Sequence, residues 1–99
     1  MKEGTLAYDC ETGRYNMVDG TGRVIVDGLH CGDVLDVYEA ELYAGDPARQ
    51  EEADREKRWV SARIEADDDD AWFLIVNGET KLFEKDPGDR ALQGIMVRV

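Results

Sequence analysis

The sequence predicts one small all-β domain whose strands follow one another as a meander and close into a barrel. Short apolar runs recur along the chain and are separated by glycine- and aspartate-containing turns, which is typical of consecutive hairpins. The 99 residues are enough for one core and no second domain. A barrel is favoured because closure removes the exposed edges that short apolar strands would otherwise leave. A strongly bent two-layer sheet is the alternative.

The first strands are expected at 4–9 and 14–19, where "GTLAYD" and "RYNMVD" lie on either side of "CETG". Gly13 supplies the positive φ that a tight hairpin requires. The turn "DGTG" then leads into "RVIV" at 23–26, which continues the meander. These three runs predict two consecutive hairpins at the start of the chain.

The stretch "DGLHCGD", residues 27–33, contains the single histidine, His30, next to Cys31, one of two cysteines. Glycines on both sides of this pair indicate a loop. Adjacent residues in an extended segment point to opposite faces, so the two side chains are not expected to meet one ligand. No second histidine completes a zinc site, and no separate base is present to activate the thiol. The sequence therefore predicts a structural turn, with no metal, cofactor or catalytic residue.

Residues 40–58 form a charged insertion after the strand-like run "VLDVYE", because "AGDPARQEEADREKR" contains almost no apolar residue. Asp46 as the cap and Pro47 as the first helical residue favour a short solvated helix. Glu51 and Arg55 are four residues apart and would support that helix as an ion pair. A mobile charged loop is an equally good interpretation, and the sequence leaves the two open.

Two further strands are expected after this insertion. The run "WVSARIEAD", residues 59–67, alternates with the period of a strand that buries one face. "AWFLIVNG", residues 71–78, is apolar on both faces and predicts a strand that is covered on both sides. The four aspartates at 67–70 predict a solvated turn between them. They do not predict a calcium site, because they lack the alternating ligands and the glycine of a calcium-binding loop.

The end of the chain contains one more turn and one more strand. Leu82 and Phe83 are isolated apolar anchors, "DPGD" at 86–89 is a strong turn signal, and "GIMVRV" at 94–99 predicts a final strand. The order of a Gly-led strand, a spacer, a Trp-led strand, a third apolar strand and a final strand is similar to that of SH3-like barrels. The fold expected for residues 1–99 is therefore a single SH3-like barrel with an insertion at 40–58.

Four segments resemble a family of short bacterial proteins of unknown function that are frequent on mobile elements of Gram-positive hosts. They are "GTLAYDCETGRYNM", "GLHCGDVLDV", "WVSARIE" and "WFLIVNG", and the resemblance covers most of the chain. It implies that residues 40–58 are an enlarged loop and that "LHCG" and "ARIE" are shared landmarks. The family has no established activity, so the resemblance implies no catalytic or binding residue.

The net charge of −11 is spread along the whole chain, and no segment is basic. Direct binding to nucleic acid is not expected, because it requires clustered Lys and Arg. The longest apolar run, Ala71 to Val76, is too short to span a membrane, so a cytoplasmic protein is expected. Cys10 and Cys31 are expected as reduced thiols, although a single bridge between them is left open.

Three classes of function remain, and a non-catalytic interaction module that binds a protein or peptide is favoured. Its surface would consist of Trp59, Trp72, Tyr38 and Tyr43, because aromatic side chains give a large contact area. The alternative for both tryptophans is the core. The second class is an acidic mimic of nucleic acid that antagonises a basic nucleic-acid-binding protein. An enzyme is disfavoured, since no nucleophile with a separate base is evident. Either a monomer or a homodimer is expected.

Overall fold

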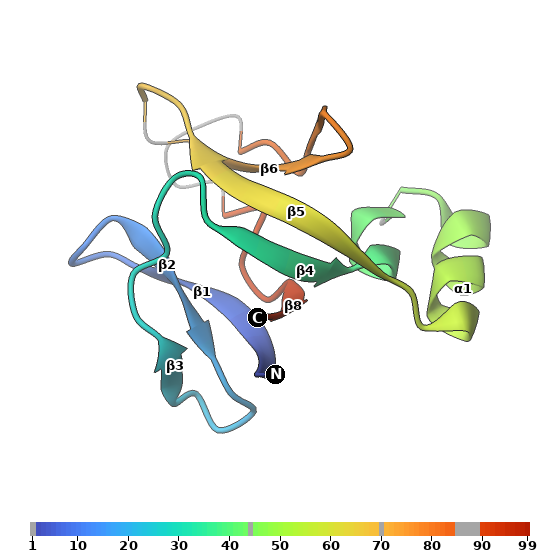
Figure 1. Cartoon of the computed structure of the whole chain (residues 1–99), viewed down its shortest axis with the longest axis horizontal. Helices are drawn as coiled ribbons and strands as arrows, with labels where there is room; N and C mark the ends of the chain where they lie inside the picture. The colour runs from blue at the N-terminus through green and yellow to red at the C-terminus, as the bar shows by residue number, and fades with distance from the viewer. Residues whose placement is uncertain (1, 44, 70, 85–89) are drawn as a thin grey trace.

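The computed structural model of the chain describes residues 2–43, 45–69, 71–84 and 90–99. In this part of the chain the backbone forms eight strands, one 3-10 helix and one α-helix (Figure 1). The first half contains β1 (Glu3–Asp9), β2 (Arg14–Val18), β3 (Val24–Val26) and β4 (Val34–Tyr38). The second half contains η1 (Glu39–Tyr43), α1 (Pro47–Glu56), β5 (Trp59–Ala66), β6 (Trp72–Val76), β7 (Glu79–Lys81) and β8 (Met96–Arg98). None of the described helices is long and apolar enough to cross a membrane.

All eight strands belong to one antiparallel sheet with the order β3-β2-β1-β8-β4-β5-β6-β7. The chain therefore forms two meanders, β1 to β3 and β4 to β7, and the last strand joins them by pairing with β1 and β4. The prediction of a single continuous meander was therefore wrong, because β8 lies between β1 and β4. The contacts that place β8 lie between segments far apart in sequence, so no local pattern contains them.

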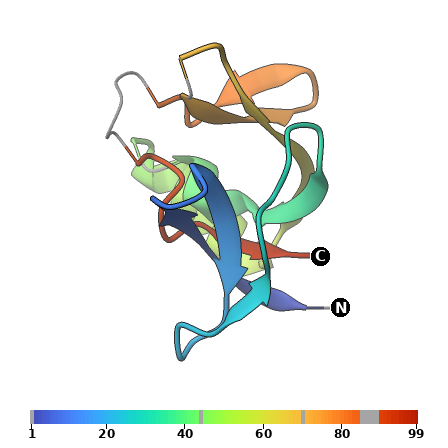
Figure 2. The same ribbon diagram turned by 90° about the vertical axis from the view of Figure 1, so that its left-hand side faces the viewer.

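The sheet is open within the described residues, with β3 and β7 at its two edges, and the prediction of a closed barrel is not confirmed. It is strongly bent, as Figure 2 shows. Five strand spacings separate β2 from β6, which is about 24 Å in a flat sheet. The rings of Tyr15 on β2 and Trp72 on β6 are nevertheless only 6.0 Å apart. The bend brings the two halves of the sheet together over one core.

The core lies inside this bend and includes residues from both meanders. The alternation predicted for β5 is confirmed, because Ala62 and Ile64 are buried while Ser61 and Arg63 are exposed. On β6 the inward residues are buried, whereas the ring of Phe73 on the other face is half-buried against Phe83. The buried cluster consists of Leu6, Tyr15, Met17, Leu29, Leu35, Val37, Ala62, Ile64, Trp72, Leu74, Val76, Leu92, Ile95 and Val97.

The predicted turns are largely confirmed. Gly13 has a φ of 71° in the turn between β1 and β2. The segment 27–33 forms neither helix nor strand, and it spans the two halves of the sheet. Leu29 N donates to Tyr15 O at 2.8 Å, and Gly32 N donates to Ile64 O at 2.8 Å. The turn predicted at 86–89 lies outside the described residues.

The charged insertion contains a helix, which was one of the two interpretations that the sequence left open. The Asp46 side chain accepts a hydrogen bond from Arg49 N at 3.3 Å, and Pro47 is the first residue of α1. Glu51 and Arg55 form the expected ion pair at 3.7 Å. Before this helix comes η1, which was not predicted from the sequence, and α1 packs against it with Ala53 as its buried residue.

We expect that deleting Gly45 to Glu56 and rejoining the chain with a short turn leaves the fold intact. None of the deleted residues belongs to the core cluster, and a shorter connection costs little free energy. The cost should be about 1–2 kcal/mol, because Ala53 loses its packing against η1. Thermal unfolding followed by circular dichroism measures it. An insoluble variant, or one without a cooperative transition, would show that α1 is required for folding.

Candidate functional site

Two of the four aromatic residues predicted as a binding surface form a pair on the outer face of the sheet. Tyr38 ends β4 and lies directly opposite Trp59, the first residue of β5. Their rings meet edge to face, with centroids 5.2 Å apart at 66°. Successive residues of a strand point to opposite faces, and the preceding Val37 is fully buried in the core. Both rings are therefore on the outer face, and both are partly exposed.

A charged pair lies beside these rings. The Arg98 guanidinium on β8 is 4.4 Å from the ring centroid of Trp59. Its Nε is 3.3 Å from Asp36 Oδ2 on β4, and the two residues are paired in the sheet. Asp36 therefore holds the cation in place over the indole face. We call Asp36, Tyr38, Trp59 and Arg98 the aromatic face.

An acidic hollow of about 380 Å³ adjoins the aromatic face at Tyr38, between η1 and α1. The Tyr38 hydroxyl donates to Asp54 Oδ1 at 2.6 Å, and this bond is the main cause of the raised pKa of Tyr38. Burial raises the pKa of the Glu41 carboxyl. The described lining of the acidic hollow contains no Lys or Arg. It consists of Tyr38, Ala40, Glu41, Pro47, Gln50, Glu51 and Asp54.

Tyr43, the third predicted residue, lies apart from the Tyr38–Trp59 pair. It is in η1, where its hydroxyl contacts Glu39 Oε1 at 3.3 Å and the guanidinium of Arg49 is 5.9 Å from its ring centroid. It lines a different hollow, of about 260 Å³, together with Val60 and Val76. The structure therefore does not bring it into the aromatic face.

Trp72 was predicted to belong to the binding surface, with the core as the alternative, and the structure places it in the core. Its side chain belongs to the core, and the residue is only 4% exposed. Its ring contacts Tyr15 edge to face, and Nε1 donates to Gly13 O at 3.2 Å. The bend of the sheet causes this burial, because it carries β2 over the face of β6 from which the indole projects. The core interpretation holds for Trp72 and not for Trp59.

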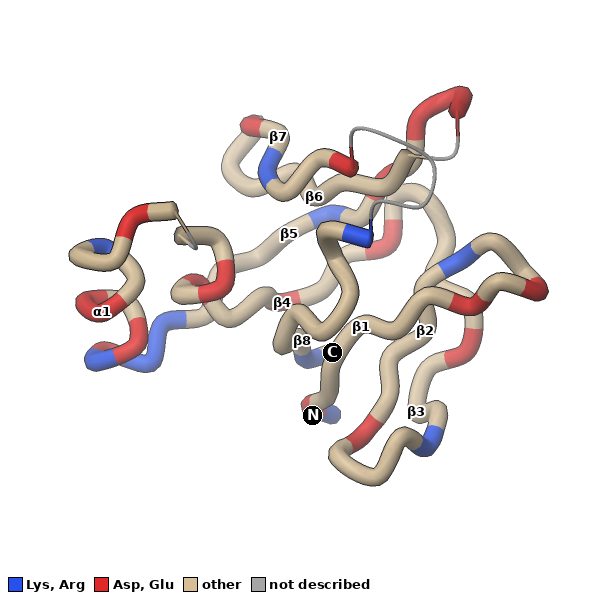
Figure 3. Tube along the Cα trace, turned by 180° about the vertical axis from the view of Figure 1, so that it is seen from behind, with Lys and Arg blue, Asp and Glu red and all other residues tan. Residues whose placement is uncertain are grey.

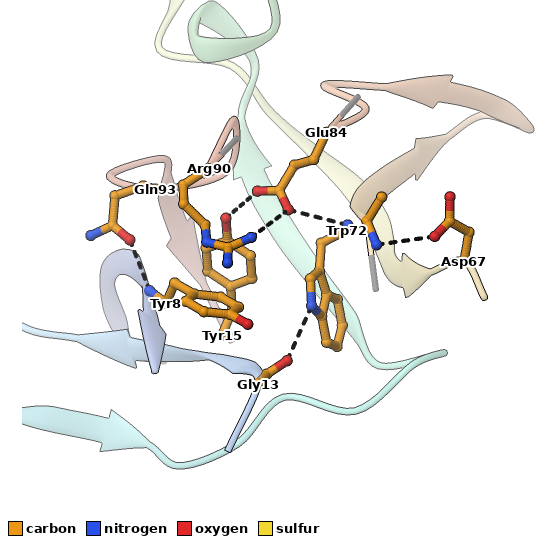
Figure 4. Close-up of polar contacts among 9 residues, drawn as sticks. Tyr8, Gly13, Tyr15, Asp67, Trp72, Glu84, Arg90 and Gln93 are labelled. Carbon is orange, nitrogen blue, oxygen red and sulfur yellow. Dashed lines mark hydrogen bonds and ion pairs between the residues drawn. The ribbon is translucent and has the colours of Figure 1, made fainter. Parts of the chain in front are cut away.

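Glu84 is a buried carboxylate that was not predicted from the sequence, and it is fully inaccessible to solvent. It accepts hydrogen bonds from the Tyr15 hydroxyl and, at 3.2 Å, from Trp72 N (Figure 4). Arg90 Nη1 lies 3.7 Å away, and the Arg90 guanidinium is 3.6 Å from the ring centroid of Tyr8. Burial, and then Glu84, raise the pKa of Tyr15, so its hydroxyl remains a donor. The local sequence "LFEK" contains no signal for this burial.

His30 and Cys31 line a third hollow, of about 550 Å³, where three turns meet. Both residues belong to its lining, whereas the sequence indicated opposite faces of an extended segment; that they would not meet one ligand stays a prediction. Extended-strand alternation does not apply there, because Cys31 and Gly32 form a turn and Gly32 has a φ of 93°. We call this the three-turn hollow, and it is lined by Thr12, Gly13, Arg14, His30, Cys31, Ala66, Asp67 and Trp72.

Cys10 and Cys31 are both free and exposed, so the bridge left open by the sequence is not formed. Within the described ranges, no three His, Cys, Asp or Glu residues are grouped so that they could hold a metal ion. The aspartates at 67–69 form a turn, in which Asp67 Oδ1 accepts hydrogen bonds from Asp69 N at 2.9 Å and Ala71 N at 3.0 Å. This oxygen therefore stabilises the turn itself.

Comparisons with known proteins agree with the expected resemblance at the level of the family. None of the curated proteins is significantly similar to the chain. A crystal structure of a protein from Ruminococcus gnavus is 33% identical in sequence and has a TM-score of 0.57. That alignment covers 99% of this chain and 100% of the other chain. A family model described as a domain of unknown function (DUF5348) matches residues 4–98. Because the match spans nearly the whole chain, the protein belongs to this family.

Proposed function

We propose that the protein is a non-catalytic interaction module that binds a protein or peptide partner through its aromatic face. The observation that carries this proposal is the outward position of the Tyr38–Trp59 pair on two adjacent strands of the sheet. Tyrosine and tryptophan provide large contact areas with few rotatable bonds, and they dominate the energy of many interfaces. Polar side chains on the outer face of these strands would have been sufficient for folding, so folding alone does not account for the exposed rings.

The strands under the aromatic face support its role as a preformed surface. β4 and β5 are paired over five residue pairs, from Val34–Arg63 to Tyr38–Trp59, and β4 is paired with β8 on its other side. Arg98 further restricts the indole ring from the β8 side. A surface whose backbone and rings are already ordered loses little conformational entropy when a partner binds.

The charge around the face indicates what kind of partner would fit it. The adjoining acidic hollow contributes Glu41, Glu51 and Asp54 next to the Tyr38 ring, and the whole chain carries a net charge of −11. A peptide with an apolar anchor for Trp59 and a basic residue for the hollow would complement both features. Free DNA or RNA would be repelled by the same field.

The alternative is an acidic mimic of nucleic acid that blocks a basic nucleic-acid-binding protein. Asp and Glu positions occur along most of the described chain, including α1 and the turns at the opposite end (Figure 3), although residues 90–99 contain none. An association with mobile elements of Gram-positive hosts, as the sequence resemblance implies, would suit such an antagonist. The two functions differ in salt dependence, because charge-led binding weakens steeply with ionic strength and apolar burial does not.

Peptides selected against the wild-type protein from a random display library are expected to lose affinity for the Trp59→Ala variant. The loss should be at least about tenfold, or about 1.4 kcal/mol, because the anchor ring is removed. Titration calorimetry measures it, and affinity should fall only about threefold between low and physiological salt. Phe83→Ala is the matched control, since Phe83 is 41% exposed but lies outside the aromatic face.

The same titrations distinguish the alternative. Steep salt dependence, together with equal affinity for the wild-type protein and the Trp59→Ala variant, would contradict the aromatic interface. The determinants would then be sought among the acidic residues of α1 and of the 67–69 turn.

A further inference from the structure

The walls of the three-turn hollow are held by hydrogen bonds that do not depend on a ligand. Asp33 Oδ2 accepts from His30 N at 2.8 Å, and Asp33 N donates to His30 O at 3.0 Å, which fixes the wall that carries His30 and Cys31. The 67–69 turn is held by the Asp67 carboxylate. The Trp72 indole is held by Gly13 O on one wall of the hollow. The hollow is therefore a preformed feature, with walls that come from three turns of the described chain.

Arg14 supplies the positive charge in the lining of this hollow. In the described part of the chain six arginines form ion pairs with carboxylates, and Arg14 is not one of them; the six are Arg49, Arg55, Arg58, Arg63, Arg90 and Arg98. The Arg14 Cδ lies 3.9 Å from the position that a Cβ would take on Gly28, so its stem runs along the 27–33 segment toward the hollow. In a chain with a net charge of −11, an arginine at a hollow that forms no ion pair with the described carboxylates can hold an anionic ligand.

The remaining lining narrows the chemistry of that ligand. Ala66 and the edge of Trp72 form an apolar part, while Thr12, His30 and Cys31 offer a hydroxyl, an imidazole and a thiol. Asp67 also lines the hollow, and its negative charge disfavours a dianion such as phosphate. A carboxylate on an apolar body satisfies the guanidinium and the apolar part together.

We propose that the three-turn hollow binds a small organic molecule that carries one carboxylate. The carboxylate is held by Arg14 with His30 beside it, and the apolar body lies against Ala66 and Trp72. This site is separate from the aromatic face, and it does not depend on the proposed protein partner.

The test uses Cys31 as a reporter of occupancy, with benzoate as the probe. The purified protein is alkylated with iodoacetamide in the presence of about 20 mM benzoate, and the rates at the two cysteines are followed by mass spectrometry of tryptic peptides. Benzoate is expected to slow alkylation of Cys31 at least about fivefold, because an occupied hollow covers the thiol. Cys10 is the internal control, since it is also free and exposed but does not line the hollow. Its rate should not change.

Two comparisons test whether protection depends on the carboxylate of the probe and on Arg14. Benzamide has the same shape without the charge and is expected to protect Cys31 less than about twofold. Arg14→Gln should abolish the protection by benzoate, whereas Arg23→Gln, which removes a cation outside the hollow, should preserve it. Thermal unfolding verifies that both variants fold. Equal protection by benzamide, equal protection of both cysteines, no protection at all, or full protection in the Arg14→Gln variant would each overturn the proposal.

Discussion

Replacing Glu84 with alanine is expected to lower the free energy of unfolding by about 3–5 kcal/mol. Glu84 is completely buried and is the common partner of the Tyr15 hydroxyl, Trp72 N and the Arg90 guanidinium. Its removal leaves buried donors without an acceptor and leaves a partly buried cation without its anion. Urea unfolding, followed by tryptophan fluorescence, measures the loss.

Two further variants test whether the loss of stability comes from the buried contacts of Glu84. Glu84→Gln retains an acceptor for Tyr15 and a similar volume, so it should cost less than Glu84→Ala while still losing the ionic contact with Arg90. Glu52→Ala removes the same side chain from an exposed position on α1 and should change stability by no more than about 0.5 kcal/mol. If Glu84→Ala costs less than about 1 kcal/mol, the carboxylate does not hold the two halves of the sheet together.

The second large effect is expected at Gly4, where alanine should destabilise the fold by about 3 kcal/mol or more. A Cβ at this position would lie 2.1 Å from Val18 O and 3.0 Å from Val18 C, both backbone atoms of β2. It would also approach Ile25 Cδ1 to 3.1 Å. Backbone atoms cannot rotate away as a side chain can, so β1 and β2 would have to separate where β2 already has an irregular register with β3.

Gly20→Ala provides the control for this prediction. Gly20 has nothing within 4 Å of the added Cβ, and it is not among the glycines with a positive φ. Its replacement should leave the midpoint of thermal unfolding nearly unchanged, because neither a clash nor backbone strain results. A Gly4→Ala variant as stable as Gly20→Ala would show that β1 can move away from β2 at little cost.

Local sequence patterns were sufficient for much of the secondary structure. The period of two in residues 59–67 predicted β5 and its buried face, and Gly13 predicted the first hairpin. Asp46 and Pro47 indicated a helix, and only the choice between helix and loop was left open. These features depend on residues within a few positions of one another, which is why the sequence contains them.

The candidate sites were only partly predictable, because their geometry depends on residues that are far apart in the sequence. Trp59 was the first choice for an exposed aromatic residue and is partly exposed, but the sequence could not separate it from Trp72, since both begin apolar strands. Which tryptophan is covered depends on the bend that brings β2 over β6. The hollow at His30 and Cys31 was missed because two other turns, at 12–14 and at 66–67, supply its remaining walls.

The sequence by itself determined that this chain is one small, acidic, mostly β domain, with its first hairpin and most of its strands near their observed places, and it offered the helix as one of two interpretations of the insertion. Only the tertiary structure decided that the sheet remains open, that β8 joins the two meanders, and that Glu84 is buried between them. The pairing of β1 with β8 joins residues more than 90 positions apart, such as Glu3 and Arg98. The free energy of such contacts comes from burial and hydrogen bonding between distant segments, so it is absent from any short window of the sequence.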